Sequence, residues 1–336
     1  MQQSQNCNVN NTDPIRAIVL LSGGLDSQLA AMLLKSQGIQ ITAVVFKSIF
    51  FDAQTAVAAA RRLDIPARVV DFTDTILGLI EHPCHGFGAG LNPCIDCHAA
   101  MLKQAGEIMR AHGFHFVASG EVLNERPMSQ NRRALKLVAD ESGIAGYLLR
   151  PLSAKLLEIT EPEKNKWVDR EKLLAIEGRS RRPQLALARE LGITVFPQPA
   201  GGCLLTDPGY GKRLRDLRQR GELRNISAIQ LLRIGRHFRL GKFKLIVGRH
   251  QTDNEIIERT AENEATILKT ISVPGPVASI PRSASETELQ LAAAICARYS
   301  DHKADEPVDI EISNGRETRI IKVLPAEQSV IDALRV

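Results

Sequence analysis

IRAIVLLSGGLDS, residues 15–27, is the stretch of sequence that decides the fold. Its apolar run, residues 18–21, is typical of a buried parallel strand. The run breaks at Ser22, and apolar residues then recur at helical spacing from Leu29 to Leu34, before Gly38 stops the helix. The segment SGGLDS therefore joins the end of a strand to the start of a helix.

The loop residues have the chemistry of a phosphate site. Gly23 and Gly24 let the backbone approach a ligand closely, and free N–H groups at a helix N-terminus favour an anion. Ser22 and Ser27 add hydroxyl donors. Asp26 would repel phosphates unless it held a Mg²⁺ ion that bridges them. The alternative is a plain strand–turn–helix with a serine cap, which the complete SGGxDS pattern disfavours.

This loop resembles the PP-loop of the ATP pyrophosphatases, which have the adenine-nucleotide α-hydrolase fold. It lacks the lysine that a Walker loop requires. The resemblance implies that ATP is cleaved between its α- and β-phosphates, that a carbonyl-type oxygen is adenylated, and that a nucleophile then displaces AMP. It also implies that the end of the second strand, at Phe46, contacts the adenine.

Strands and helices alternate at short spacing through the first 200 residues. Apolar runs predict strands at 41–46, 67–72 and 114–118. Helices are expected at 52–63, 98–112, 130–141, 169–177 and 183–191. Such alternation favours an α/β fold, a Rossmann-like doubly wound parallel sheet whose ligand lies at the carboxyl ends of the strands.

The composition of the sequence changes beyond about residue 207, where basic residues become frequent. A strand is expected at 243–247, a helix at 286–299, and a hairpin of strands 308–312 and 318–323 around a two-residue turn at Asn314-Gly315. These signals predict a smaller C-terminal α+β domain. We expect a disordered leader at 1–14, a PP-loop domain with the cysteines at 15–206, and a basic α+β RNA-binding domain at 207–336.

Composition limits the class of protein. A chain of 336 residues favours two domains, and 44% hydrophobic with 24% charged residues is ordinary for a globular protein. The 4% aromatic content argues against base stacking as the main means of binding RNA, while a net charge of +5 suggests an anionic partner. No membrane span and no signal core are evident, so a cytoplasmic protein with reduced thiols is expected.

Three of the six cysteines stand in patterns that suggest chemistry. Cys94 and Cys97 form CxxC ahead of a helix, and Cys203 follows about a hundred residues later. The pattern fits a redox pair, half of a zinc site that histidines could complete, ligands of an iron–sulfur cluster, or buried inert thiols. Cys7 and Cys296 are interpreted as bystanders, and Cys84 is left undecided.

Two of these alternatives deliver sulfur. Three thiolates from Cys94, Cys97 and Cys203 fit a 4Fe–4S cluster with one open iron, which can carry a sulfide able to displace AMP. The runner-up is a persulfide relay in which Cys203 carries the sulfur and Cys97 resolves it.

Several motifs together resemble tRNA thiolation enzymes. SGEVL at 119–123, with SQ at 129–130, is similar to a stretch of the tRNA 4-thiouridine synthetases. NPCIDC at 92–97 and GGC at 201–203 resemble the paired cysteine sites of the 2-thiouridylases, and the three-cysteine set is similar to that of the cluster-dependent tRNA thiolases. LRIGRHF at 232–238 and the residues after it resemble the small RNA-binding module of the NFACT proteins.

The resemblance implies an ATP-dependent tRNA sulfurtransferase that makes 4-thiouridine or 2-thiouridine. Asp26, Cys97 and Cys203 would be catalytic, and Cys94, Cys97 and Cys203 would hold the cluster. The cofactors implied are ATP, Mg²⁺ and the 4Fe–4S cluster. The ATP contacts implied are Ser22, Gly23, Gly24, Asp26, Ser27, Phe46 and Gly120.

The expected partners are tRNA and a sulfur donor, either a cysteine desulfurase or free sulfide. Two groups of arginines are expected to contact RNA phosphates, although a solvated basic face is the alternative. They are Arg179, Arg181 and Arg182 in the first domain and Arg233, Arg236 and Arg239 in the second.

Two other functions remain open from sequence. One is a PP-loop ligase or amidotransferase acting on a small molecule. The other is an RNA-binding protein that uses ATP only as a structural ligand, against which Asp26 and the three cysteines argue.

Overall fold

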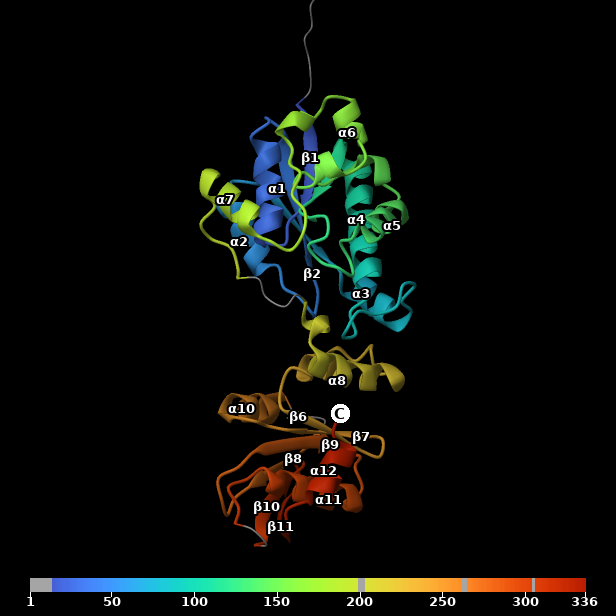
Figure 1. Ribbon diagram of the computed structural model, residues 1–336. Helices are drawn as coiled ribbons and strands as arrows, with labels where there is room; N and C mark the ends of the chain where they lie inside the picture. Colours follow the sequence, from blue (N-terminus) through green and yellow to red (C-terminus); the bar gives the residue numbers. More distant parts are fainter. Residues whose placement is uncertain (1–13, 199–202, 261–264, 304–305) are drawn as a thin grey trace, which may run out of the picture. The chain divides into compact units, whose positions relative to one another are not determined.

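The computed structural model describes residues 14–198, 203–260, 265–303 and 306–336. The chain divides into two compact units between Pro208 and Gly209 (Figure 1). Residues 1–13 of the predicted leader, and Gly201 and Gly202 of the GGC motif, lie outside the described residues.

A five-stranded sheet forms the centre of the first unit, and all of its strand pairs are parallel. The strand order is β3-β2-β1-β4-β5, so β1 lies in the middle with β2 on one side and β4 on the other. The predicted Rossmann-like parallel sheet is confirmed. The strands are β1 Arg16–Leu20, β2 Gln40–Lys47, β3 Ala67–Asp71, β4 Phe116–Ser119 and β5 Leu148–Leu149.

Helices cover both faces of this sheet. In Figure 1, α1, α2 and α7 lie on one side and α3, α4 and α5 on the other. Small residues on the first side, such as Ala31 of α1 and Ala56, Ala59 and Ala60 of α2, let these helices pack closely on the strands. The helices are α1 Leu25–Lys35, α2 Gln54–Arg62, α3 Thr73–Glu81, α4 Cys94–His112, α5 Arg132–Ser142, α6 Glu161–Lys164 and α7 Arg182–Glu190.

One predicted helix is wrong. Residues 169–177 contain only a 3₁₀ turn, Arg170–Lys172. Beyond this turn the backbone binds the chain after β5: Leu174 donates its N–H to Pro151 O at 3.0 Å, and Ile176 donates to Leu152 O at 2.8 Å. These long-range hydrogen bonds replace the helical ones that the apolar spacing suggested.

The second unit contains a six-stranded antiparallel sheet in the order β11-β10-β8-β9-β7-β6, with several helices. This confirms the predicted smaller α+β domain. Its core lies between the sheet and α11, where Ala292, Ile295 and Cys296 are fully buried. The elements are α8 Pro208–Gln219, α9 Ile226–Leu231, β6 Arg236–Leu240, β7 Phe243–Val247, α10 Gln251–Thr260, β8 Ala265–Thr270, β9 Val277–Pro281, α11 Glu286–Arg298, β10 Val308–Ser313, β11 Thr318–Val323 and α12 Gln328–Leu334.

The predicted hairpin joins β10 and β11, but its turn is longer than expected. Ser313 pairs with Thr318, which leaves four residues in the loop. Asn314 Oδ1 accepts the N–H groups of Arg316 and Glu317, both at 2.9 Å. Gly315 adopts a φ of 80°, which a residue with a side chain rarely takes. The asparagine side chain therefore organises a wider turn than the two-residue type.

None of the helices within these described residues has the length and apolar character needed to cross a membrane.

Candidate nucleotide and thiol site

The SGGLDS loop lies where β1 ends and α1 begins. In the sheet, β1 is flanked by β2 on one side and β4 on the other. Ser27 Oγ donates to Gly24 O at 2.9 Å and accepts from the N–H of Ser22 at 3.3 Å. Gly24 is the N-cap of α1. The loop is therefore closed by its own serines, and no side chain of the described residues caps the N-terminus of α1.

Two glycines are required by close packing. Gly23 has a φ of 80°, and a Cβ atom there would lie 2.9 Å from Ala56 N. A Cβ atom at Gly120, just after β4, would lie 2.6 Å from Asp26 C and Ser27 N. Gly120 therefore supports the loop from the neighbouring strand end, which places it beside the residues predicted to bind ATP.

Asp26 presents a buried oxygen without a partner. Among the described residues, Oδ1 has no hydrogen-bond donor, and Oδ2 lies 4.0 Å from Arg181 Nη2. Burial raises the pKa of Asp26, while the charge of Arg181 opposes that rise. A buried carboxylate oxygen in the first turn of α1 is the kind of ligand that Mg²⁺ takes.

A cavity of about 390 Å³ opens in front of this loop, which is within the usual range for small-molecule sites. The apolar end is formed by β2 and its surroundings, and Phe46 packs edge-on against Phe72 with ring centroids 5.3 Å apart. Every residue predicted to contact ATP except Gly23 lines the cavity: Ser22, Gly24, Asp26, Ser27, Phe46 and Gly120.

Cys94 and Cys97 stand in the first turn of α4, because this helix begins at Cys94 and not near residue 98 as expected. Their spacing of three places both thiols on one side of the helix, and both line the cavity. Asn92 Nδ2 donates to Cys94 Sγ at 3.0 Å. The Cys94 sulfur therefore stands at the N-terminus of α4 with a side-chain donor beside it.

Cys203 is brought to the same cavity by a packed backbone contact. Leu91 donates its N–H to Leu205 O at 3.1 Å, and a Cβ atom at Gly90 would lie only 2.3 Å from that oxygen. The chain after Cys203 is thus docked on the loop that leads to Cys94. Cys203 therefore lines one cavity with the SGGLDS loop and with Cys94 and Cys97, from which it is about a hundred residues away in the sequence.

Burial raises the pKa of the Cys97 thiol, and the nearby Cys203 and Cys94 thiols raise it further. Cys97 is therefore a poor nucleophile on its own, and it becomes a thiolate most readily when a cation or a metal compensates the charge. Thiols that line one cavity are the groups that a metal centre or a sulfur relay would use.

A buried carboxylate lies beside the thiols, and the sequence did not reveal its role. Glu121 accepts from Arg150 Nε at 2.8 Å and Ser119 Oγ at 3.0 Å, and its Oε1 lies 3.1 Å from His98 Nδ1. Burial opposes ionisation, but the charges and hydrogen bonds of Arg150 and His98 lower the pKa of Glu121. The ionised carboxylate orients His98, which follows Cys97 and lines the cavity. The SGEVL motif contained Glu121, but only the fold could show its partners.

Further charged groups surround Asp26. Burial raises the pKa of Glu125, as does the negative charge of Asp26, whereas Arg126 and Arg181 oppose these effects. Both Glu125 and Arg126 line the cavity. Arg181 is held there because α7 packs on α1. Two arginines and two carboxylates next to the loop suit a magnesium–phosphate group.

The arginines predicted to contact RNA have different environments. Arg179 and Arg182 are exposed, whereas Arg181 lies beside Asp26. In the second unit Arg233 is exposed. Arg236 lies 4.4 Å from the ring centroid of Tyr299 and donates to Gly248 O at 2.9 Å.

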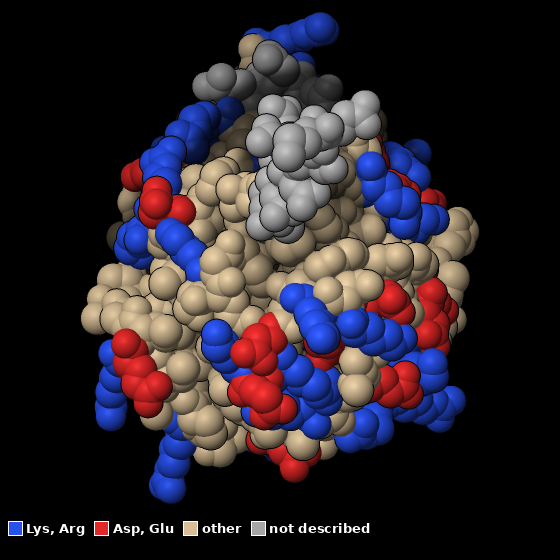
Figure 2. Space-filling model, turned by 90° about the horizontal axis from the view of Figure 1, so that it is seen from above, with Lys and Arg blue, Asp and Glu red and all other residues tan. Residues whose placement is uncertain are grey.

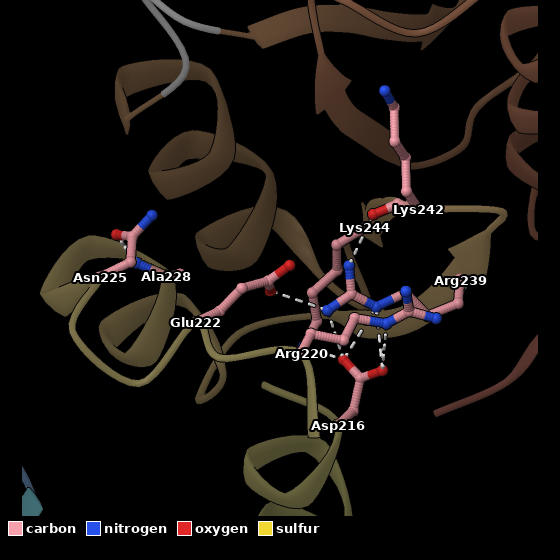
Figure 3. Close-up of polar contacts among 8 residues, drawn as sticks. All are labelled: Asp216, Arg220, Glu222, Asn225, Ala228, Arg239, Lys242 and Lys244. Carbon is pink, nitrogen blue, oxygen red and sulfur yellow. Dashed lines mark hydrogen bonds and ion pairs between the residues drawn. The ribbon is translucent and has the colours of Figure 1, made fainter. Parts of the chain in front are cut away.

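Arg239 is held inside an ionic network (Figure 3). It donates to Asp216 through Nε and Nη2 and to Glu222 Oε2 at 2.9 Å, and its side chain is 10% exposed. Lys244 shares Asp216 at 3.2 Å. This arrangement gives Arg239 a structural role, joining β6 to α8, and its predicted contact with RNA stays untested.

The face shown in Figure 2 has lysine and arginine side chains interspersed with acidic ones. The basic side chains visible there do not form one continuous patch. RNA binding on that face would therefore rely on contacts made by separate basic residues.

Comparison with known proteins identifies the two parts of the chain. Residues 15–163 match the model of the tRNA methyl transferase HUP domain, and residues 235–335 match that of the NFACT protein RNA binding domain. The first part of the chain is thus similar to a HUP domain, and the second to an NFACT RNA-binding domain. Both resemblances drawn from the sequence are confirmed at this level.

Curated relatives of the HUP domain are named tRNA-specific 2-thiouridylase MnmA. The protein from Bradyrhizobium sp. (strain ORS 278) is 30% identical over 156 residues, which cover 40% of this chain and 38% of that protein. The one from Methylorubrum populi is 25% identical over 337 residues, which cover 90% of this chain and 80% of the relative. The chain thus spans under two fifths of the Bradyrhizobium relative that it matches.

Among solved structures, one described as a 4-thiouridine synthetase–RNA complex with bound ATP is 20% identical to the chain. The matched region covers 64% of this chain and 52% of the chain in that structure, with a TM-score of 0.36.

Proposed function

We propose that this chain is an ATP-dependent tRNA sulfurtransferase that adenylates a uridine carbonyl oxygen and replaces it with sulfur. The observation that carries the proposal is the meeting of two kinds of group in one cavity. The SGGLDS loop with Asp26 and the three thiols of Cys94, Cys97 and Cys203 face the same space. The names of the relatives and the NFACT-type module support tRNA as the substrate.

In the first step, the loop N–H groups and the Ser22 hydroxyl bind the phosphates of ATP, and the Ser27 hydroxyl joins them by exchanging its bond to Gly24 O for a phosphate oxygen. Asp26 holds the magnesium ion through its unpartnered oxygen, and Arg126 and Arg181 offset the remaining negative charge. The uridine oxygen attacks the α-phosphorus, the bond to the β-phosphate breaks, and pyrophosphate leaves. The base must leave its stack to reach this cavity.

In the second step, sulfur attacks the activated carbonyl carbon, and the carbon–oxygen bond to AMP breaks. The sulfur comes from the side of the cavity that Cys94, Cys97 and Cys203 line. His98 is oriented by Glu121 and lines the same cavity as the thiols. Its other ring nitrogen can donate or accept a hydrogen bond.

The proposal of an iron–sulfur cluster is supported by one observation, that Cys94, Cys97 and Cys203 line one cavity. Three thiolates would leave one iron of a 4Fe–4S cluster open. When bound, such a cluster supplies the iron that delivers sulfur. The persulfide relay, with Cys203 as carrier and Cys97 as resolving thiol, uses the same three positions. The names of the relatives support thiolation and do not favour the cluster over the relay.

The first step can be tested with purified protein, Mg·ATP and unmodified tRNA, by measuring pyrophosphate release. We expect release that depends on tRNA, and a loss of at least about a hundredfold in Asp26→Asn, since removing one transition-state electrostatic group costs this much. Asp74→Asn is the matched control, because Asp74 also stands in the first turn of a helix but is exposed.

Pyrophosphate release without tRNA, stimulated instead by a small carboxylic acid or amine, would contradict the proposal and favour the PP-loop ligase. Equal release by wild type and Asp26→Asn would contradict the role given to Asp26.

A further inference from the structure

A second group of metal-ligand side chains lies outside the cavity. His85 comes from the loop between α3 and α4, Asp96 from the first turn of α4, and Glu141 from the end of α5. One ligand atom of each lies within 4.8 Å of the others. None of the three lines the cavity described above. Nothing in the mechanism uses them.

Asp96 is the buried member of the group. Its side chain is 3% exposed, and its Oδ2 accepts the backbone N–H of His85 at 3.2 Å. Its Oδ1 faces His85 Nε2 at 3.9 Å, which is too far for a hydrogen bond. A buried carboxylate is costly unless a cation or several donors compensate its charge.

His85 faces two carboxylates with one nitrogen atom. Its Nε2 lies 2.7 Å from Glu141 Oε1 as well as 3.9 Å from Asp96 Oδ1. At 2.7 Å the hydrogen-bond partner of Nε2 is Glu141, so Nε2 makes no hydrogen bond to Asp96 Oδ1. A metal ion bound by Nε2 can take both oxygens as further ligands.

We propose that His85, Asp96 and Glu141 hold a divalent transition-metal ion of the zinc class. One imidazole and two carboxylates, with water at an open position, are ligands that Zn²⁺ and Co²⁺ accept. Mg²⁺ and Ca²⁺ prefer oxygen ligands alone, so they fit this set less well. The inference does not depend on the proposed thiolation.

A metal ion bound here would link three segments near the thiols: the loop between α3 and α4, the first turn of α4, and the end of α5. Asp96 stands between Cys94 and Cys97, and the loop that holds His85 continues to Asn92, the donor to Cys94. Binding at His85 and Glu141 fixes this loop to α4 and α5. The site is structural, and it holds the first turn of α4 in the position that presents the two thiols.

The test uses the full chain with Cys94, Cys97 and Cys203 changed to Ser, so that thiols in the cavity cannot bind metal. Co²⁺ alone is the probe, added to chelator-treated protein and followed by visible absorption. We expect one equivalent to bind, with d–d bands and no thiolate-to-cobalt charge-transfer band. His85→Ala and Glu141→Gln should weaken binding by at least tenfold. His82→Ala is the control, because His82 is an exposed histidine of the same loop.

If the chain with these three substitutions does not fold, the comparison uses the chain that keeps all of its cysteines. Glu141→Gln should then bind one equivalent of Co²⁺ fewer than wild type by metal analysis. The proposal is overturned if the folded triple-serine chain binds no Co²⁺, or if His85→Ala and Glu141→Gln bind it as tightly as His82→Ala. Either result would make the group an ordinary ion pair.

Discussion

Arg181 Nη2 lies 4.0 Å from Asp26 Oδ2, so an arginine expected from sequence to contact RNA is placed at the phosphate-binding loop. Its Nε is buried and has no hydrogen-bond partner among the described residues. This partly buried guanidinium lies next to the loop, and we infer that it contacts the nucleotide phosphates.

We therefore expect Arg181→Ala to weaken Mg·ATP binding by about tenfold, the value of one charge-assisted hydrogen bond. Isothermal titration with ATP measures this, and Arg179→Ala, an exposed neighbour, is the control. If Arg181→Ala lost tRNA affinity and kept its ATP affinity, Arg181 would contact RNA, as the sequence suggested, and not the nucleotide.

Gly120→Ala tests the close packing behind the loop. A Cβ atom 2.6 Å from Asp26 C must displace the loop backbone, at a cost of about 1–3 kcal/mol. We expect the KM for ATP to rise at least tenfold. Gly78→Ala, in α3 with no atom within 4 Å of the added carbon, should leave the KM unchanged. Equal KM values for the two variants would show that the loop tolerates the displacement.

Glu121→Gln should destabilise the first unit by roughly 3 kcal/mol, because it leaves Arg150 charged and buried. Urea unfolding measures this loss. Glu107→Gln, on the exposed side of α4, should change stability by less than about 0.5 kcal/mol. A Glu121→Gln chain as stable as wild type would mean that the pair contributes no net stability.

The same residue gives a pH dependence. Because the pKa of Glu121 is lowered from its ordinary 4.5 in the folded chain, its stabilisation is present above pH 4.5. It is lost as the pH falls below that value, since the unfolded chain then binds the proton more readily. The free energy of unfolding of wild type should therefore fall more steeply below pH 4.5 than that of Glu121→Gln. Parallel curves would contradict the assignment.

Arg233 and Arg239 should respond differently to substitution. Arg233→Glu is expected to weaken tRNA binding and to lower the slope of log K against log salt by about one, as the loss of a phosphate contact does. Arg316→Glu, an exposed arginine in the hairpin loop, is the control for net charge. The same loss in both variants would indicate a charge effect without a defined contact.

Arg239→Gln should instead unfold the second unit at lower urea, because it leaves Asp216 and Glu222 without their guanidinium. Lys244, whose pKa burial lowers to about 8, compensates only part of that charge. Weaker tRNA binding at unchanged stability would show that Arg239 contacts RNA after all.

The sequence predicted the parts of the site that lie within one strand–loop–helix segment. The apolar run, two glycines and Asp26 specify the loop because each acts locally. The thiols were found by their motifs, but their common cavity depends on the Leu91–Leu205 contact, which no local pattern indicates.

What the sequence missed depends on long-range packing. The basic segment 178–182 looked like a surface patch, yet the packing of α7 on α1 turns Arg181 to Asp26. Glu121 was visible in a motif, but its partner Arg150 is 29 residues away. Residues 169–177 had helical spacing, and pairing with residues 151 and 152 overrode it.

The measurement that tests the central claim most directly is nucleoside mass spectrometry of total tRNA from cells that lack this gene. The account predicts the loss of one thiolated uridine, restored by the wild-type gene and not by Cys203→Ala. Unchanged thionucleosides in cells that have no second tRNA thiolase would contradict tRNA thiolation as the function of this chain.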